Sequence, residues 1–157
     1  MTSPILMAEH LDVAIGRARI LRDVGLEIAP GEAHGLIGES GSGKSMFARA
    51  VLGLLPDGAR VSGTLAFEKQ SLVGLPDRTY RTLRGNRIGY IPQDPGAAFN
   101  PTLRIADQIA EPVEFHRARA AEVRPLPPVE MLRSVGLTEP ERRIRQYPHE
   151  MSGGMLQ

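Results

Sequence analysis

The sequence predicts an α/β fold in which antiparallel strands come first, a glycine-rich loop follows a buried strand, and helices close the chain. Residues 5–15 and 20–29 mix apolar and polar side chains in the broken alternation that is typical of antiparallel strands. Residues 34–37 form a short apolar run, which leads directly into a glycine-rich loop and then into a helical pattern. From Leu103 onward the apolar spacing is mainly helical.

The composition excludes several classes of protein. The chain of 157 residues has room for one domain with a real core. It carries 19 basic and 18 acidic side chains, a formal net charge of +1, which gives no support for a basic nucleic-acid surface. It has no cysteine, so disulfides and thiolate metal sites are excluded. No stretch approaches the apolar length that spans a bilayer, so we expect any membrane role to be peripheral.

Short local signals predict the remaining elements. Residues 44–55 have apolar side chains at helical spacing, and we expect residues 56–58, Pro-Asp-Gly, to end that helix. The others follow in chain order: a strand at 61–67, a short helix at 76–83, a short strand at 88–91, a proline-rich loop at 92–101, and helices at 103–115 and 129–135. Gly136 is a candidate C-cap for the last of these, and Ser152 is a candidate N-cap for a further helix.

The glycine-rich loop fits the phosphate-loop pattern G-x-x-x-x-G-K-[ST] at every position. Its residues are Gly38, Glu39, Ser40, Gly41, Ser42, Gly43, Lys44 and Ser45. Glycines let successive backbone N–H groups point at one anion, and the following helix adds the partial positive charge of its N-terminus. Lys44 would bring a full charge to the β- and γ-phosphates, and Ser45 a hydroxyl ligand for magnesium. The pattern therefore predicts a site for a nucleoside triphosphate, with ATP and Mg²⁺ as the expected cofactors.

The alternative is a glycine-rich turn that contains Lys-Ser by chance. The match at all eight positions, between an apolar run and a helical pattern, argues against it.

Three further segments narrow the choice among phosphate-loop proteins. Gln93-Asp94-Pro95 is followed by Asn100-Pro101, and Ala110-Glu111-Pro112 follows within a predicted helix. Residues 147–157 read Tyr-Pro-His-Glu-Met-Ser-Gly-Gly-Met-Leu-Gln. Together with the loop, this order resembles the ATP-binding subunit of ABC transporters. The residues of these motifs are most similar to those of the oligopeptide, dipeptide and nickel importer branch. The resemblance runs from about Leu11 to Gln157.

The resemblance implies a P-loop NTPase fold of the ABC type. Antiparallel strands and part of a parallel sheet would form a P-loop core portion over residues 1–93. A helical subdomain would follow over residues 94–151, and residues 152–157 would begin the signature helix. These bounds are approximate, and together they would make a partial nucleotide-binding domain.

The resemblance also assigns roles to single residues. Gln93 falls at the Q-loop glutamine, whose amide contacts magnesium or the attacking water and senses the γ-phosphate. Magnesium would then be held by Ser45 and Gln93. Ile15 falls where the adenine ring would be contacted. The signature residues, which would contact ATP held by a second subunit, are Ser152, Gly153, Gly154 and Gln157. Taken alone, Gln93 is a loop glutamine and Ser152 an ordinary N-cap.

Three departures from the family pattern affect these expectations. Ile15 replaces the usual aromatic residue, so apolar contact with adenine would remain without stacking. Leu156 stands where this branch usually has arginine. The family's Walker B aspartate and catalytic glutamate, which follow the signature helix, have no counterpart in the 157 residues. We therefore expect a fragment that binds triphosphate but hydrolyses it poorly, and that aggregates or melts without cooperativity.

The function implied by the resemblance is the ATP-binding subunit of an importer for peptides, with nickel as the second choice of solute. It would lie peripherally on the cytoplasmic face of the inner or plasma membrane. Its partners would be a second ATP-binding subunit and transmembrane permease subunits, with a periplasmic or lipid-anchored solute-binding protein acting indirectly. One alternative is a non-hydrolysing nucleotide-binding module. Another is a soluble ABC ATPase acting on nucleic acid or ribosomes, against which the near-neutral charge argues.

Overall fold

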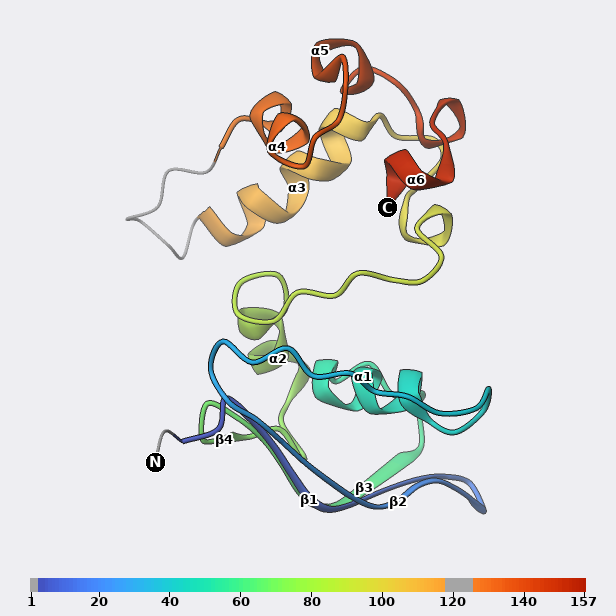
Figure 1. The fold of residues 1–157 in the computed structure, drawn as a ribbon, viewed down its shortest axis with the longest axis vertical. Helices are drawn as coiled ribbons and strands as arrows, with labels where there is room; N and C mark the ends of the chain where they lie inside the picture. The colour runs from blue at the N-terminus through green and yellow to red at the C-terminus, as the bar shows by residue number, and fades with distance from the viewer. Residues whose placement is uncertain (1–2, 118–125) are drawn as a thin grey trace. The chain divides into compact units, whose positions relative to one another are not determined.

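The computed structural model describes residues 3–117 and 126–157, which belong to two compact units. The first unit is Met1–Arg84 and the second is Gly85–Gln157 (Figure 1). Each unit has its own buried side chains and is described separately below. The functional subdivision at residues 93 and 151 stays a prediction.

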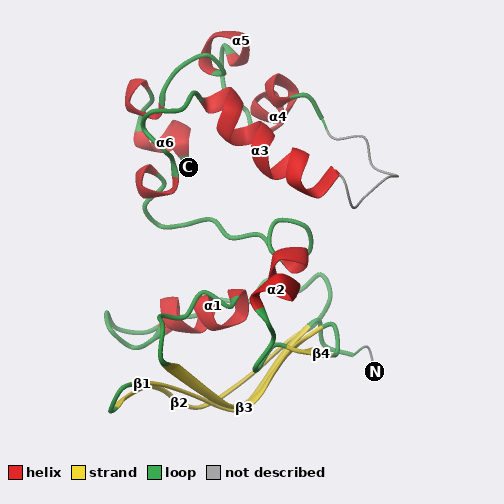
Figure 2. Cartoon of the chain, turned by 180° about the vertical axis from the view of Figure 1, so that it is seen from behind, coloured by secondary structure: helices red, strands yellow, loops and turns green. Residues whose placement is uncertain are grey.

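A four-stranded antiparallel sheet forms the base of the first unit (Figure 2). Its strands are β1 (Leu6–Ile15), β2 (Ala18–Ile28), β3 (Ala59–Phe67) and β4 (Gln70–Ser71). The spatial order is β2-β1-β3-β4, so β1 has a partner on each side. The strands predicted at 5–15, 20–29 and 61–67 are confirmed. Leu11, Val13 and Leu65 are almost fully buried beneath the helices of this unit.

An irregularity in the middle of β1 requires a glycine on the neighbouring strand. His10 has a positive φ of 48°, and the pairing between β1 and β3 shifts between Glu9 and Asp12. Gly63 lies opposite with a φ of +86°, and a Cβ atom there would be 2.1 Å from the His10 carbonyl oxygen. Any other residue would therefore overlap the backbone of β1. His10 Nδ1 also lies 2.7 Å from Asp23 Oδ1, across the sheet.

Two helices lie on one face of this sheet (Figures 1 and 2). They are α1 (Lys44–Leu52) and α2 (Asp77–Leu83). The apolar spacing predicted for α1 is confirmed, because Phe47, Ala50, Val51 and Leu52 are its buried residues. The helix ends earlier than expected, at Gly53, whose φ of 64° and N–H bonds to the last turn form the cap.

Tyr80 of α2 joins the end of α1 to the chain that follows β4. Its hydroxyl donates to the Leu72 carbonyl at 2.9 Å, and its ring fills the space that a Cβ on Gly53 would need. Burial raises the pKa of Tyr80, and the nearby Arg84 guanidinium opposes that rise.

We expect Tyr80→Phe to destabilise the packing of α2 on α1 by about 1 kcal/mol, because the Leu72 carbonyl loses its buried donor. Hydrogen exchange of the α1 amides measures the change. Tyr90→Phe is the matched control, because the Tyr90 side chain is exposed and lies in the other unit. Equal protection of α1 in Tyr80→Phe and the native chain would contradict the assignment.

Two predicted strands are wrong. Residues 34–37 are extended but unpaired, with Leu36 50% and Ile37 97% exposed. Residues 88–91 likewise form no strand beyond an isolated bridge at Ile88, and Ile91 is 75% exposed. A strand exists only where a neighbour completes its backbone hydrogen bonds. The described residues supply no parallel neighbour for either segment, so the sheet that is present is entirely antiparallel.

The second unit is built from short helices around a small apolar cluster (Figure 1). The helices are α3 (Ile105–Arg117), α4 (Pro128–Ser134), α5 (Pro140–Arg143) and α6 (Gly153–Leu156), with 3-10 turns at Gly96–Ala98 and Pro148–Glu150. Ile105, Leu132 and Ile144 are the buried cluster. Gly136 follows α4 with a φ of 80°, as predicted for a C-cap.

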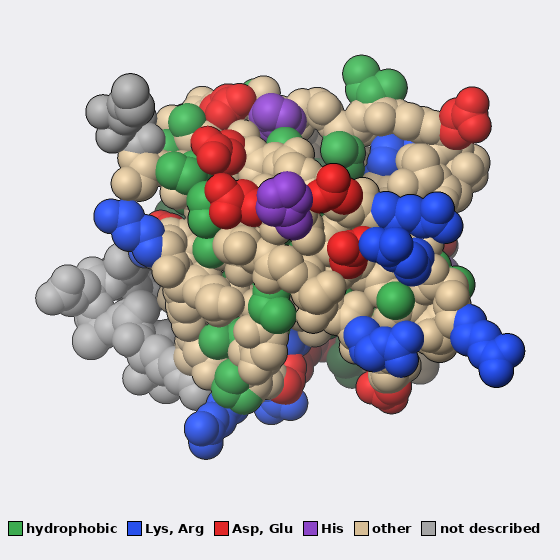
Figure 3. Space-filling model, turned by 90° about the horizontal axis from the view of Figure 1, so that it is seen from below, with side chains coloured by type: hydrophobic (Ala, Val, Ile, Leu, Met, Phe, Trp, Pro, Cys, Tyr) green, Lys and Arg blue, Asp and Glu red, His purple; other side chains and the backbone are tan. Residues whose placement is uncertain are grey.

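No helix among the described residues is long and apolar enough to cross a bilayer. Acidic, basic and histidine side chains all lie on the face seen from below, with several basic side chains gathered at one side of it (Figure 3). Arg19 forms an ion pair with Asp12 at 2.5 Å.

Candidate phosphate-binding site

The glycine-rich loop joins the extended segment 32–38 to the first turn of α1. The first hydrogen bond of the helix runs from the Phe47 N–H to the Gly43 carbonyl at 2.9 Å. The N–H groups of Lys44, Ser45 and Met46 precede it, so they have no acceptor within the helix. These donors face the N-terminal end of α1, where the helix dipole is positive. The local structure therefore presents a concentration of donors to an anion.

The side chain of Lys44, near the C-terminal end of the loop, folds back over the loop. Its Nζ donates to the carbonyls of Gly38 and Glu39, each at 2.7 Å, and lies 3.4 Å from Ser42 Oγ. These contacts tie the ammonium group to the centre of the loop, although most of the loop is exposed to solvent. A phosphate group in the loop would meet a full positive charge as well as the backbone donors.

A side chain at any of three glycines of the loop would disturb it, for a different structural reason at each position. Gly41 and Gly43 have φ values of +83° and +99°, which side-chain-bearing residues rarely adopt. A Cβ on Gly43 would also lie 2.6 Å from Leu21 Cδ2 of β2. Gly38 has an ordinary φ, but a Cβ there would be 2.8 Å from Ser42 Oγ. The backbone of the loop therefore requires glycine at positions 41 and 43, whereas a side chain at position 38 would meet only the Ser42 side chain.

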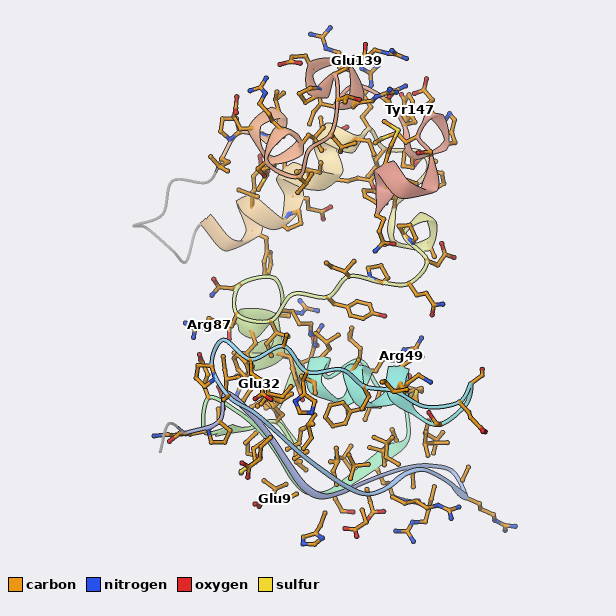
Figure 4. The ribbon with its side chains drawn as sticks, in the orientation of Figure 1. Glu9, Glu32, Arg49, Arg87, Glu139 and Tyr147 are labelled. Atoms are coloured by element: carbon orange, nitrogen blue, oxygen red, sulfur yellow. The ribbon has the colours of Figure 1, made fainter. Side chains whose placement is uncertain are left out.

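The turn that leads into the loop is fixed by Glu32 (Figure 4). Its Oε2 accepts the Ala29 N–H at 2.7 Å, and its Oε1 accepts from His34 Nδ1 at 3.0 Å. The Ala29 hydrogen bond, followed by that of His34, lowers the pKa of the Glu32 carboxyl. Gly31, with a φ of 78°, completes the reversal that the Pro-Gly-Glu sequence predicts.

A cavity of about 230 Å³ lies beside the loop, between β2 and α1. Its lining residues are Leu21, Val24, Gly25, Leu26, Leu36, Ile37, Gly38, Ser42, Gly43, Lys44 and Phe47. The polar side chains in this lining, Ser42 and Lys44, both come from the loop itself, and no carboxylate is among the residues.

The residues present fit a triphosphate with magnesium. The N–H groups at the start of α1 and the Lys44 ammonium are donors, and the residues that line the cavity beside the loop include no carboxylate. Ser45 is exposed in the first turn of the helix, and its hydroxyl would be the side-chain ligand of a metal bound to the phosphates. Among the described residues, no group of three or more His, Asp or Glu side chains could hold a metal.

Ile15 lies at the end of β1, beside the hairpin turn to β2. It is half-buried and pairs with Ala18 and Ala59. The hairpin and the glycine-rich loop lie at the same end of the first unit (Figures 1 and 2). At the position predicted to contact the adenine base, the chain therefore has an aliphatic side chain and no aromatic ring.

The other predicted site residues all lie in the second unit. Gln93 is exposed in the loop before the Gly96–Ala98 turn. Ser152 is the N-cap of α6, but its side chain makes no capping hydrogen bond, and Gly153 and Gly154 are exposed. Their N–H groups are the unpaired donors at the start of that short helix.

Two side chains near the signature segment have contacts that sequence reasoning missed. Gln157 Nε2 lies 3.4 Å from the Pro92 carbonyl, next to Gln93. Leu156 packs against the buried cluster of this unit, which gives an apolar residue at that position a physical role. Tyr147, in the turn before Ser152 (Figure 4), stacks on His149 with ring centroids 5.6 Å apart.

Comparison with known proteins agrees with the motifs. The ABC transporter family matches residues 21–157. The oligopeptide transport ATP-binding protein OppD of Mycobacterium tuberculosis is 44% identical over 141 residues, which cover 87% of this chain and 22% of that protein. The dipeptide transport ATP-binding protein DppD of Bacillus subtilis is 36% identical over 159 residues, covering 98% of this chain and 48% of the relative. The chain thus spans less than half the length of these relatives.

Solved structures share the fold. The ATP-binding subunit of an ABC transporter superposes with a TM-score of 0.71 at 26% identity, covering 97% of this chain and 57% of the other. The dimeric ATP-binding cassette MJ0796 bound to ADP and Pi gives a TM-score of 0.73 at 23% identity, covering 96% and 65%. The predicted P-loop fold of the ABC type is therefore confirmed, in partial form.

Proposed function

The chain belongs to the ABC transporter family, and on that premise we propose that it is the ATP-binding part of an importer for peptides or related small solutes. The observation that carries the proposal is the Lys44 ammonium held across a glycine-rich loop at the N-terminus of α1. A loop of this kind selects a polyphosphate, because several backbone donors and one full charge converge on it. The peptide as solute rests on the names of the relatives.

Each loop residue has a distinct part in holding the nucleotide. Backbone N–H groups of Gly41, Gly43, Lys44 and Ser45 would bind the phosphates, whereas the Ser42 N–H already donates to the Glu39 carbonyl. The Lys44 ammonium would neutralise the β- and γ-phosphates. Magnesium, when bound, would neutralise phosphate charge and orient the terminal phosphoryl group. Ser45 would hold it through its hydroxyl, and Gln93 would contact it or the attacking water. Ile15 would contact the base through apolar surface.

The remaining assignments concern assembly. Ser152, Gly153 and Gly154 would contact the γ-phosphate of ATP held by a second ATP-binding subunit, with Gln157 at the edge of that contact. Permease subunits would anchor the assembly at the cytoplasmic face of the membrane, and a solute-binding protein would deliver the solute. The dimeric MJ0796 cassette supports the two-subunit arrangement by analogy of fold.

A second candidate function is nucleotide binding without hydrolysis. It is favoured by the lining of the cavity beside the loop, which includes no carboxylate that could act as a general base. ATP binding and phosphate release should be measured on the same preparation of the chain. We expect binding, with phosphate release no faster than in a Lys44→Ala sample. Release well above that control would assign an active ATPase, and absence of binding would overturn both functions.

A further inference from the structure

The loop that carries Gln93 is held near its far end by one side-chain amide. Gln108, in the first turn of α3, accepts the Asn100 N–H on Oε1 at 2.7 Å. Its Nε2 donates to the Asn100 carbonyl at 3.0 Å and to the Leu103 carbonyl at 2.9 Å. A primary amide has one acceptor oxygen and two N–H donors, and all of these groups are used here. No other residue type of this length provides both functions at once.

The three hydrogen bonds of Gln108 to Asn100 and Leu103 form what we call the Gln108 clamp. The Asn100 side chain extends this clamp into the loop. Its Oδ1 accepts from both the N–H and the hydroxyl of Thr102, at 3.0 and 2.8 Å, while Gln108 fixes its backbone on both sides. Phe99, the preceding residue, packs against the buried cluster of the second unit. The chain from Phe99 to Leu103 is therefore anchored by one apolar and several polar contacts.

The near end of the same loop is held by a second amide. Gln157 Nε2 lies 3.4 Å from the Pro92 carbonyl, which belongs to the peptide bond that begins Gln93. Between the two anchored ends, Asp94 Oδ1 accepts the Ala97 N–H at 3.3 Å and so shapes the turn at Gly96–Ala98. Gln93 itself is exposed. The loop thus holds its conformation while leaving the Gln93 side chain accessible.

We propose that Gln108 is a positioning residue that presets the conformation of the loop that carries Gln93, with Gln157 bracing the opposite end. This inference rests on the proposed function, because it takes Gln93 as the group that contacts magnesium. Residues that orient a metal-contacting group, without touching the metal, change metal-dependent affinity about 10- to 100-fold when they are replaced. The phosphate cradle is built from other residues, so binding that needs no metal should not depend on Gln108.

The test compares ATP affinity of the whole chain in EDTA with its affinity in excess Mg²⁺, and takes the ratio as the magnesium gain. Gln108→Met keeps the length of the side chain and removes its three hydrogen bonds. Gln108→Glu keeps an acceptor for the Asn100 N–H but removes both donors. Gln70→Met, at an exposed position of β4, is the matched control. Hydrogen exchange of the Asn100 amide and of α4 reports the clamp and the surrounding fold.

We expect both Gln108 variants to lose at least about tenfold of the magnesium gain, with unchanged affinity in EDTA, faster exchange at Asn100 and unchanged α4. Gln70→Met should match the native chain. If Gln108→Met also loosens α4, Gln157→Met tests the same loop from its other end, and it should reduce the gain as well. A magnesium gain that is absent from the native chain, or that survives these substitutions, overturns the inference alone. Failure of the native chain to bind ATP in EDTA overturns the proposed function.

Discussion

Lys44→Ala should weaken ATP binding by about a hundredfold, the equivalent of about 2.8 kcal/mol. The substitution removes the ammonium group that lies 2.7 Å from the Gly38 and Glu39 carbonyls at the centre of the loop. It leaves the phosphates with backbone donors alone. Hydrogen bonds to charged groups are the strong ones, and they are strongest where several converge on one anion. Isothermal titration of ATP into the purified chain measures the loss.

Lys69→Ala is the matched control for this prediction. Lys69 is the other lysine of the chain, and it lies in the turn between β3 and β4, where it is exposed. It carries the same charge as Lys44 without lining the cavity beside the loop. A general loss of positive charge would weaken binding equally in both variants. Equal affinities of Lys44→Ala and Lys69→Ala would therefore contradict a specific role for Lys44.

Gly63→Ala should open the pairing between β1 and β3, with amide protection in those strands falling about a hundredfold. The added methyl group would lie 2.1 Å from the His10 carbonyl oxygen and 2.8 Å from that of Glu9. These are backbone atoms of the central strand, so the overlap can be relieved only by moving the strands apart. The positive φ of 86° adds a second penalty. Hydrogen–deuterium exchange resolved by peptide measures the change.

Gly58→Ala separates the two penalties. Gly58 has a similar φ of +77°, but nothing lies within 4 Å of the position of its Cβ. It should therefore show only the backbone cost, about 1–2 kcal/mol at most. Gly63→Ala should be clearly worse than this control. If the two variants lose protection equally, the close approach of His10 to Gly63 is not what fixes the register of the sheet.

The glycine-rich loop could be predicted from the sequence because its geometry is local. Gly43 and Lys44 begin a helix, and Gly41 and Gly43 have positive φ values that glycine adopts without strain. The β1–β2 hairpin could be predicted for a similar reason, because its strands are joined by two residues and pair with each other. Both features depend on backbone preferences and short-range contacts.

Features that depend on distant neighbours could not be predicted in the same way. The apolar run at Leu36 and Ile37 suggested a buried strand, but burial requires a partner strand that the described residues do not provide. The sequence predicts that α1 ends at residues 56–58, but the helix ends at Gly53, where the absence of a side chain makes room for the Tyr80 ring. The Gln108 clamp has no sequence signature, since an amide in a helix is usually solvated.

The loop at residues 38–45 is expected to bind a nucleoside triphosphate through its terminal phosphates. The most direct measurement is a titration of the chain with ATP and with AMP, each in EDTA and in Mg²⁺. If the donors of the loop bind the β- and γ-phosphates as proposed, one ATP should bind saturably per chain and AMP should not compete with it. Equal binding of AMP and ATP, or no saturable binding of ATP, would contradict the claim.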